Sequence, residues 1–509
     1  MSEKANKQPK QQESTPLGHY KQDGKQLKPP LAQLNMQEAS WINSRLPEML
    51  WAALLIVKLG RDKALPILRH ALKHIETAKV PGTTLTDIAK WPPELRKSFI
   101  ELIVSLDSEA KAALRPLLIF PKLPAYDDWR AVIGEDAKPE DGIDLAKTVE
   151  AVLFHQSQEA TDCRWVKVMG FIFTGRVHVT AALADGFEEI LKYPDVGDMR
   201  SVRPRIRSME IFESLDGSEY TWAKTFWDAC YNNTPCIPEL NEETKEVVEQ
   251  KRAEMTKDKP YYVKASHEVR DSLMSHFFDT STTTAVDARH ETVLGIGLYA
   301  LDEYIQMVIT LTSTSANARV IIRTLFEAYL TLAYLLKKET EGELLWEAYR
   351  QHGVGQISLI ERHYEDDKLS SGLVDIKMMD RIANEDRWSE FVPINLGHWD
   401  SGDLRKIALQ VGEKKLYDTY YPYTSGFTHA SWGAVRETSM QSCLNPLHRL
   451  HHIPSYGLPV LPNANADGAK LIDKILELVG KAYPDFKPRI GILPKQSSQS
   501  KKTSTKKKS

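Results

Sequence analysis

The chain has 509 residues and a mass of 57.8 kDa, with 42% hydrophobic and 27% charged residues. This length permits two to four domains with buried cores, and it excludes a peptide hormone, a small disulfide scaffold and a metal-stapled finger. The formal net charge of −3 favours neither a nucleic-acid-binding chain nor an acidic tail protein.

The charge is unevenly placed along the chain. Residues 1–30 hold six lysines and three acids, and residues 495–509 hold six lysines and no acid, which leaves −12 on residues 31–494. Both ends are rich in Gln, Ser and Lys, so we expect disordered tails at 1–33 and 491–509. The run Lys506–Lys508 is typical of a solvated tail; the alternative is a weak electrostatic contact with RNA, DNA or the acidic body.

Cysteine use and hydropathy indicate the compartment. Four cysteines are spread without a C-x-x-C pair, whereas a zinc quartet would need closer pairs, so we expect reduced thiols. No apolar signal segment opens the chain, and the apolar stretches at 49–59 and 320–336 contain charges or are too short to cross a membrane. We therefore expect a cytoplasmic protein without a membrane partner.

Helix signals dominate the first half. Ser44, Pro47 and Glu48 predict a helix start that leads into 49–57 and stops at Gly60, followed by a second helix at 62–78. Two more helices are predicted at 92–106 and from 107 to Arg115, before Pro116. These pairs with short connections suggest a helical bundle or array.

The middle of the chain is less regular. Residues 146–154 are typical of a helix, whereas the apolar run 165–174 fits a buried strand or a buried helix, and we favour the helix because no partner strands are evident. Residues 242–258 form a charged helix pattern that ends before Lys259-Pro260. We place the domain boundary there.

The second half predicts four consecutive helices at 264–278, 285–311, 316–338 and 343–364, with Thr/Ser or Gly breaks between them. The third is apolar almost all round and is expected to be the central buried helix. Further helices are predicted at 404–411 and 469–482, with an aromatic segment at 417–432 between them.

The central helix holds the most informative pair. Arg323 and Glu327 are four residues apart and therefore share one face. Buried charges must be paired and hydrogen-bonded, so the two either form an internal ion pair or face a shared polar group. A plausible third group is His429, which lies in the aromatic segment among Ser425, Thr428 and Ser431. A structural role is the ordinary one for such a histidine, but its hydroxyl and ring neighbours, including Tyr423, make it the best pocket candidate.

A resemblance follows from these residues. The apolar helix with Arg323-Thr-Leu-Phe-Glu327, followed by Ser-Gly-Phe-Thr-His-Ala-Ser at 425–431, resembles an uncharacterised family of bacterial all-helical proteins. Their outline is similar to the HEPN superfamily of helical ribonucleases and toxins, many of which act in phage defence or toxin–antitoxin systems. The resemblance covers about 260–450, and the N-terminal half shows none.

The resemblance implies a chemistry that can be compared with the sequence. HEPN ribonucleases carry Arg-x(4–6)-His on a helix: the histidine moves a proton for attack by the RNA 2′-hydroxyl, the arginine stabilises the charge on phosphorus, and no metal is required. Arg270 to His276 and Arg69 to His74 fit this spacing, but neither lies where the resemblance is strongest. Arg323, Glu327 and His429 are therefore the first catalytic candidates, with Arg270 and His276 as the alternative.

The remaining motifs give little support for other enzymes. Walker A, H-E-x-x-H and G-x-S-x-G motifs are missing from the sequence. His448, His451 and His452 form a local cluster that could bind a metal, but a surface loop is favoured, and we expect no metal and no cofactor.

These observations predict an all-α protein of two helical domains, 34–258 and 259–490, the second HEPN-like. The expected function is that of a bacterial intracellular defence or stress-response protein. The resemblance implies that it would act as a metal-independent RNA-cleaving effector. The binding residues would be Tyr423, Ser425, Thr428 and Ser431, and the resemblance implies a homodimer. The alternative is a non-catalytic helical scaffold that binds a partner protein through its acidic N-terminal bundle.

Overall fold

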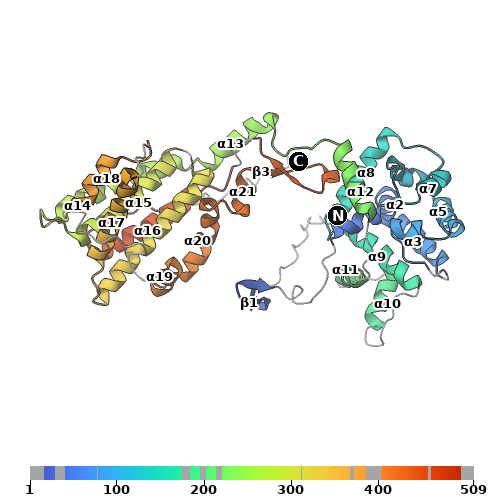
Figure 1. Ribbon diagram of the computed structural model, residues 1–509, viewed down its shortest axis with the longest axis horizontal. Helices are drawn as coiled ribbons and strands as arrows, with labels where there is room; N and C mark the ends of the chain where they lie inside the picture. Colours follow the sequence, from blue (N-terminus) through green and yellow to red (C-terminus); the bar gives the residue numbers. More distant parts are fainter. Residues whose placement is uncertain are drawn as a thin grey trace, which may run out of the picture. The chain divides into compact units, whose positions relative to one another are not determined.

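The computed structural model describes residues 17–28, 40–76, 78, 80–174, 184–194, 202–213, 221–310, 312–366, 372–385, 403–456 and 460–493. In this part of the chain nearly all regular structure is helical, and the strands form only two two-stranded sheets, β1–β2 and β3–β4. The predicted all-α fold is confirmed (Figure 1).

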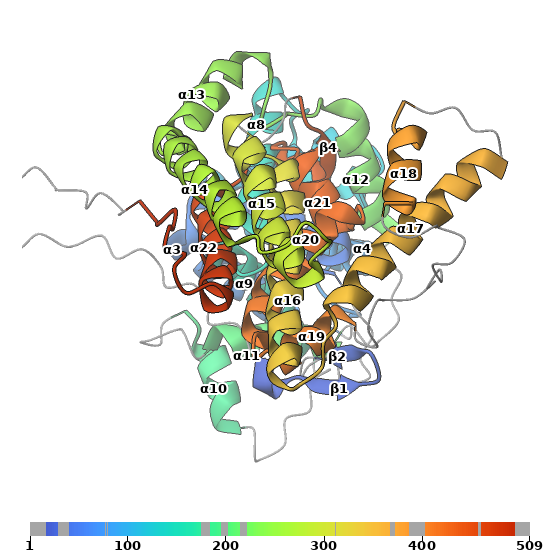
Figure 2. The ribbon, with the colours of Figure 1, turned by 90° about the vertical axis from the view of Figure 1, so that its left-hand side faces the viewer.

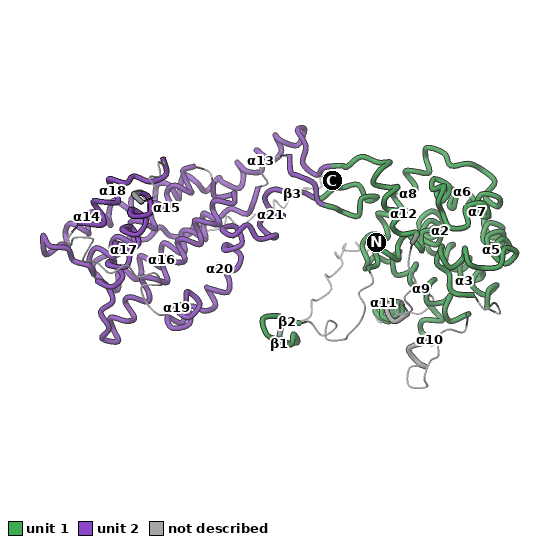
Figure 3. The backbone as a smooth tube through the Cα atoms, viewed as in Figure 1, with its two compact units in different colours: residues 1–237, 442–451 green, residues 238–441, 452–509 purple. Residues whose placement is uncertain are grey.

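The chain divides into two compact units, each with its own core (Figure 3). Unit 1 comprises residues 1–237 and 442–451, and unit 2 comprises residues 238–441 and 452–509. The elements of unit 1 are η1 (Leu17–His19), β1 (Lys21–Asp23), β2 (Gln26–Lys28), the π-helix η3 (Trp41–Arg45), α1 (Leu46–Glu48), α2 (Leu50–Leu59), α3 (Arg61–His74), α4 (Leu85–Ala89), α5 (Pro93–Leu106), α6 (Ala110–Leu114), η4 (Arg115–Ile119), α7 (Tyr126–Ile133), α8 (Pro139–Leu153), α9 (Gln158–Phe173), α10 (Ala184–Lys192), α11 (Val202–Glu213), α12 (Thr221–Asn233) and η10 (Pro446–His448).

Helices α2 and α9 form the centre of unit 1. Helix α2 is apolar on nearly every side, and it ends at Gly60, whose φ of 77° favours glycine. Helix α9 begins after Ser157, whose hydroxyl accepts a hydrogen bond from the Ala160 amide, and its residues 160–171 are all buried. The ambiguous run at 165–174 is therefore mostly a buried helix, as favoured from the sequence.

The elements of unit 2 are η7 (Glu242–Thr244), α13 (Lys245–Met255), α14 (Lys259–Thr280), α15 (Ala288–Ile309), η8 (Thr312–Thr314), α16 (Ala316–Thr340), α17 (Trp346–Asp366), α18 (Ile376–Ala383), α19 (Leu404–Gln410), α20 (Lys414–Thr428), α21 (Trp432–Thr438), β4 (His452–Pro454) and α22 (Asn465–Ala482); β3 (Met440–Ser442) ends at its border with unit 1. Helix α16 contacts α15, α20 and α22, and the long helices lie side by side in Figure 2. The prediction of a central buried helix at 316–338 is confirmed.

Helix α15 is long and apolar enough to cross a membrane by length and composition, and it is the one such helix among the described residues. In unit 2 it packs between α14, α16 and α22, and most of its apolar window is buried. Packing is close at Gly297, where a Cβ atom would lie 3.0 Å from Leu273 Cδ2. The composition of α15 is therefore accounted for by its place in a protein core.

The domain boundary predicted at 258 differs from the observed division after Ile237. Asn463 donates hydrogen bonds to the carbonyl of Met255 and to the carboxylate of Asp258, which ties the end of α13 to the segment before α22. Gln441 likewise exchanges hydrogen bonds with the backbone of Leu240. Residues 238–258 therefore belong to unit 2, and these long-range contacts leave no local sequence signal.

The expected disorder of residues 1–33 is wrong for part of that segment. Residues 21–28 form an antiparallel hairpin in which Lys21 pairs with Lys28 and Asp23 with Gln26. The two turn residues are Gly24 and Lys25, and Gly24 has a φ of 56°, which favours glycine at the first position of a two-residue hairpin turn. An ion pair of 2.6 Å between Asp23 and Lys28 adds to it. Leu17–His19 form η1, whereas residues 1–16 and 29–33, and 494–509 of the C-terminal tail, lie outside the described residues.

Candidate functional site

The three residues that the sequence singled out come together between α16 and α20. Arg323 and Glu327 lie on consecutive turns of α16, and His429 is the residue directly after α20. Helix α20 was not expected from the sequence, which gave only an aromatic segment at 417–432. It forms despite Pro422 in its interior, because it packs along α16.

Arg323 is the centre of this cluster. Its Nε donates to Glu327 Oε1 at 2.7 Å, its Nη1 lies 3.4 Å from Ser425 Oγ and 3.3 Å from His429 Nε2, and its Nη2 donates to the Tyr421 hydroxyl at 3.2 Å. An arginine only donates, so this contact is a hydrogen bond only with Nε2 of His429 as the acceptor. The internal ion pair and the shared third group, which were alternatives in the sequence, are therefore both present.

The cluster is partly open to solvent. The Arg323 side chain is 16% exposed and that of Glu327 is 40% exposed, while His429 is exposed. Burial lowers the pKa of Arg323, but the hydrogen bond and charge of Glu327 outweigh it, so the net effect is a raised pKa. The arginine thus stays charged beside an accessible imidazole.

Tyr421 is a member of the cluster that the sequence analysis missed. Its ring centroid lies 4.9 Å from the Arg323 guanidinium carbon, and it stacks on Tyr417 at 4.7 Å. The signal for it was helical spacing: Tyr417, Tyr421 and Ser425 are four residues apart and share one face of α20.

The predicted binding residues are divided between this cluster and its surroundings. Ser425 belongs to the cluster, whereas the hydroxyl of Tyr423 donates to Glu437 Oε1 at 2.8 Å. Thr428 and Ser431 are exposed where the chain turns from α20 into α21. The chain packs closely at Gly426, where a Cβ atom would lie 2.6 Å from Ser431 Oγ.

The alternative pair Arg270 and His276 is not assembled as a site. Six positions on an α-helix place two side chains about 120° apart around its axis. Arg270 pairs with Asp302 of α15, whereas the ring of His276 packs against Tyr483 and Phe486. Their partners therefore hold them on different faces of α14.

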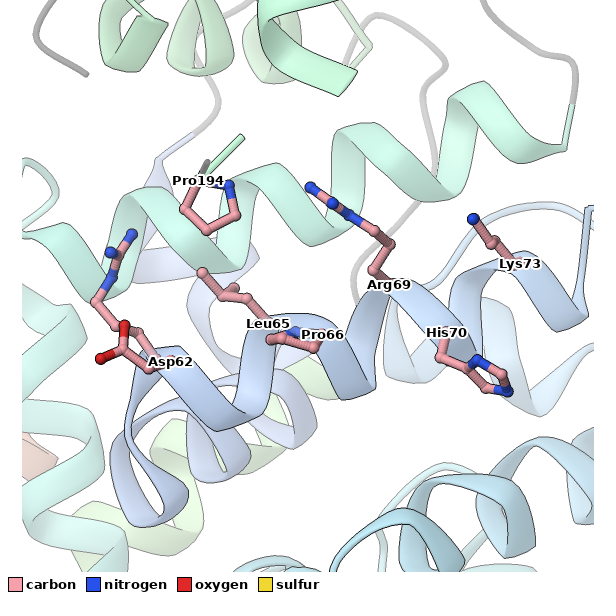
Figure 4. Close-up of a pocket in the computed structure, with 8 residues that line it drawn as sticks. Asp62, Leu65, Pro66, Arg69, His70, Lys73 and Pro194 are labelled. Carbon is pink, nitrogen blue, oxygen red and sulfur yellow. The ribbon is translucent and has the colours of Figure 1, made fainter. Parts of the chain in front are cut away.

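The pair Arg69 and His74 lies on α3 in unit 1 and is also separated. Arg69 donates to the backbone carbonyls of Leu191 and Tyr193, while His74 Nε2 lies 3.1 Å from Ser98 Oγ of α5. Arg69 and Lys73 do project on the same side of α3 as Pro194, into a cleft of about 290 Å³ (Figure 4). Because Arg69 ties α3 to the end of α10, we assign it a structural role.

A second group of possible ligands lies wholly in unit 1. Cys236, Cys443, His448 and His451 each offer one sulfur or nitrogen atom, and these four atoms all lie within 4.8 Å of one another. The sequence had marked His448 and His451 as a cluster that could bind a metal, but it gave no reason to join Cys236 to them, because Cys236 follows α12 whereas the other three residues follow β3. Cys443-x4-His448-x2-His451 was the local signal.

Comparison with known proteins reaches only part of the chain. Residues 307–442 match a family of unknown function (DUF5677). Neither the curated proteins nor the solved structures contain a match to this chain.

The matched segment runs from the last turn of α15 to the end of β3. It includes Arg323, Glu327, Tyr421, Ser425 and His429, and it begins after Arg270 and His276. The cluster between α16 and α20 therefore lies inside the matched segment, whereas the alternative pair lies outside it.

Proposed function

We propose that unit 2 cleaves RNA without a metal ion and that Arg323 and His429 are its catalytic residues. The observation that carries this proposal is the distance of 3.3 Å between Arg323 Nη1 and His429 Nε2. A neutral imidazole beside a permanent cation is the pair that phosphodiester transesterification needs, one as the base and one for the charge on phosphorus.

In the proposed reaction His429 Nε2 takes the proton of the RNA 2′-hydroxyl, and that oxygen attacks the adjacent phosphorus. The bond from phosphorus to the 5′ oxygen breaks, and the imidazolium returns its proton to the leaving oxygen. The products are a 2′,3′-cyclic phosphate and a 5′-hydroxyl. Arg323 stabilises the extra negative charge of the phosphorane during this step.

The other members of the cluster act as positioning residues. Glu327 accepts from Nε at 2.7 Å and Tyr421 holds Nη2 at 3.2 Å, so they fix the plane of the guanidinium. The contacts of Nη1 with Ser425 and His429 are long for hydrogen bonds. A phosphate oxygen would make a shorter, charge-assisted bond to Nη1, so this edge suits the substrate.

The net charge of the chain and the exposed rings near the cluster fit a local contact with single-stranded RNA. The net charge of residues 31–494 is −12, so binding must come from the cluster and its rim rather than from a broad basic face. Tyr423 and Trp432 are 47% and 63% exposed near the end of α20, and exposed rings stack on unpaired bases. Tyr423, Thr428 and Ser431 are the proposed binding residues.

The wider role in this proposal comes from the resemblance to HEPN proteins. It is that of a cytoplasmic effector in bacterial defence or stress response, acting as a homodimer. Light scattering of the purified protein should give twice the chain mass, and a monomer at all accessible concentrations would contradict the homodimer.

The catalytic proposal is tested with a labelled RNA oligonucleotide in the presence of EDTA. The wild-type protein should cleave it to products with 2′,3′-cyclic phosphate ends, and an oligonucleotide with 2′-deoxyribose at the cleaved position should resist. His429→Ala and Arg323→Ala should each lower the rate by about 10²-fold or more. His267→Ala is the matched control, because this exposed histidine lies on α14 away from the cluster.

The outcomes separate the two functions. Cleavage that survives in folded His429→Ala protein would remove this histidine from the mechanism. If folded wild-type protein cleaves no RNA in a pool of mixed sequence, the enzyme proposal fails and the scaffold that binds a partner protein takes its place.

A further inference from the structure

We propose that Cys236, Cys443, His448 and His451 bind a structural zinc ion in unit 1. The quartet consists of two thiols and two imidazoles, the ligand set of a closed tetrahedral zinc site. All four residues lie in the same compact unit. With four protein ligands the site has no open position for a substrate, so the ion would stabilise the fold.

The distances fit this geometry. Cys236 Sγ lies 3.5 Å from His448 Nδ1 and 3.3 Å from His451 Nε2, and Cys443 Sγ lies 3.5 Å from His448 Nδ1. Zinc–sulfur bonds of 2.3 Å and zinc–nitrogen bonds of 2.0–2.1 Å at tetrahedral angles place sulfur and nitrogen about 3.5 Å apart. The three sulfur–nitrogen distances thus match a tetrahedral zinc site, and all four ligand atoms lie within 4.8 Å of one another.

The orientation of His448 supports metal binding at Nδ1. Its other nitrogen, Nε2, lies 3.1 Å from the backbone carbonyl of Thr234, to which it can donate only if it carries the proton. That proton on Nε2 leaves the lone pair of Nδ1 directed at the two sulfurs. A metal-binding histidine ordinarily has such a carbonyl partner on its second nitrogen.

The backbone around the quartet holds the ligands in place. The Ile237 amide donates to Cys443 Sγ at 3.4 Å, and the Leu444 amide donates to the Ile237 carbonyl at 2.7 Å. Buried Asn445 donates to Thr234 Oγ1 and to the Pro235 carbonyl, so the two ligand-bearing segments are joined by their backbones and side chains.

The backbone of the turn between His448 and His451 also supports a zinc site. Arg449 and Leu450 have φ values of 56° and 55°, in the left-handed region that is unfavourable for residues other than glycine. This turn brings His451 back beside His448, and the centroids of the two imidazole rings lie 5.1 Å apart. Binding energy from a shared ion would offset the cost of that conformation.

Two cysteines at this distance also suggest a disulfide, but the observations favour zinc. Both thiols are free, and each lies next to an imidazole nitrogen rather than only next to the other sulfur. Cys443 is fully buried whereas Cys236 is exposed, so the site is held by the protein on one side and open to entry of an ion on the other.

The test uses the full-length protein, made in zinc-supplemented medium and purified without a histidine tag or chelator. Mass spectrometry of the metals should find about one zinc per chain. Cys236→Ser should lose zinc during dialysis against a weak chelator, with a loss of affinity of about tenfold or more. Since Cys236 is exposed, this variant should fold, which circular dichroism will check.

His452→Asn is the matched control, because His452 directly follows the quartet but packs against Trp432. It should keep its zinc. Exchange of zinc for Co²⁺ should give the absorption of tetrahedral cobalt with thiolate ligands, and Cys443→Ser or His451→Asn should remove it.

Three results would overturn the proposal. They are folded wild-type protein that holds no zinc and gives no cobalt spectrum, zinc that stays bound in Cys236→Ser with unchanged affinity, and an intact mass lower by two hydrogens that maps to a Cys236–Cys443 disulfide. None of them bears on RNA cleavage, whose catalytic residues all lie in unit 2.

Discussion

Glu48 is an acid in the apolar core of unit 1, with none of its surface exposed. Burial raises its pKa to about 7, although hydrogen bonds from the amide and hydroxyl of Thr86, at 2.9 and 2.8 Å, favour the charged form. Nearby Asp87 raises the pKa further and Lys167 lowers it. The folded chain therefore holds a proton on Glu48 that the unfolded chain has already released.

This raised pKa predicts a pH dependence of stability. Between pH 4.5 and about 7 the folded state binds more protons than the unfolded state, so the free energy of unfolding falls as pH rises and levels off above 7. The loss amounts to about 3 kcal/mol. Glu48→Gln, which keeps the shape and the contact with Thr86, should abolish this part of the dependence, measured by urea titration with hydrogen exchange in α2 at pH 5 and pH 8.

Glu94→Gln on the exposed side of α5 is the control for the Glu48 prediction. It removes one carboxylate without a change in core burial. If Glu48→Gln gives the same loss of stability from pH 5 to pH 8 as the wild type, Glu48 does not hold its proton in the folded state.

At the residue scale, the sequence predicted the central residues of the candidate site and their neighbour Ser425, but it did not predict Tyr421. A charged pair at i and i+4 in an apolar helix is detectable, because burial of charge demands a partner. The spacing of Tyr421 from Tyr417 and Ser425 is informative only if residues 414–428 form a helix, and their aromatic and hydroxyl residues and Pro422 favour a helix weakly. Packing against α16 decides that helix.

Among the elements of unit 1, α11 is joined to α9 through a buried carboxylate. Glu210 of α11 has no exposed surface and lies 2.7 Å from Arg45, 3.3 Å from Arg164 and 3.6 Å from Lys167. Burial of Arg164 lowers its pKa to about 10, and the negative charge of Glu210 opposes this lowering. A single acid thus serves three cations from η3 and α9.

Glu210→Gln should therefore be strongly destabilising. It removes the charge that compensates buried cations, a change that costs about 3–5 kcal/mol. Glu189→Gln is the matched control, because Glu189 pairs with Arg205 at a side-chain exposure of 40% and such pairs contribute about 0–1 kcal/mol. Thermal unfolding should show a clear loss of stability for the first variant only; equal, small changes would mean that the buried cations find other acceptors.

For the whole molecule, the fold class and the order of the long helices could be predicted from the sequence, but the division into two units could not. In unit 2 the bounds of α14, α15, α16, α17, α19 and α22 were predicted within about five residues, because apolar periodicity and Thr/Ser breaks are local signals, whereas α18, α20 and α21 were not predicted. The return of residues 442–451 to unit 1 is not local. It depends on Leu447, which lies in the core of unit 1, and on the hydrogen bond from the Leu444 amide to the Ile237 carbonyl. Both contacts join residues that are far apart in the chain.

The return of residues 442–451 to unit 1 leads to a prediction about the cores of the two units. Leu447 is 5% exposed and belongs to the core of unit 1, where η10 contacts α8 and α12, although it follows almost all of unit 2 in the chain. Leu447→Ala should destabilise unit 1 by about 2–5 kcal/mol, since it removes buried methyl groups and leaves a cavity. Hydrogen exchange of the full-length protein should therefore become faster in α8 and α12 and stay unchanged in α16 and α22.

Leu444→Ala controls for a change in the same segment, because Leu444 is 51% exposed and its truncation leaves no cavity. The reverse experiment is Ile475→Ala, which removes a fully buried side chain from the core of unit 2 and should speed exchange in α16 and α22 alone. Faster exchange in both units from either core variant would show that the two cores unfold as one cooperative body. Faster exchange confined to one unit means that each core holds its own helices, so that residues 442–451 belong to unit 1 by packing and not by their position in the chain.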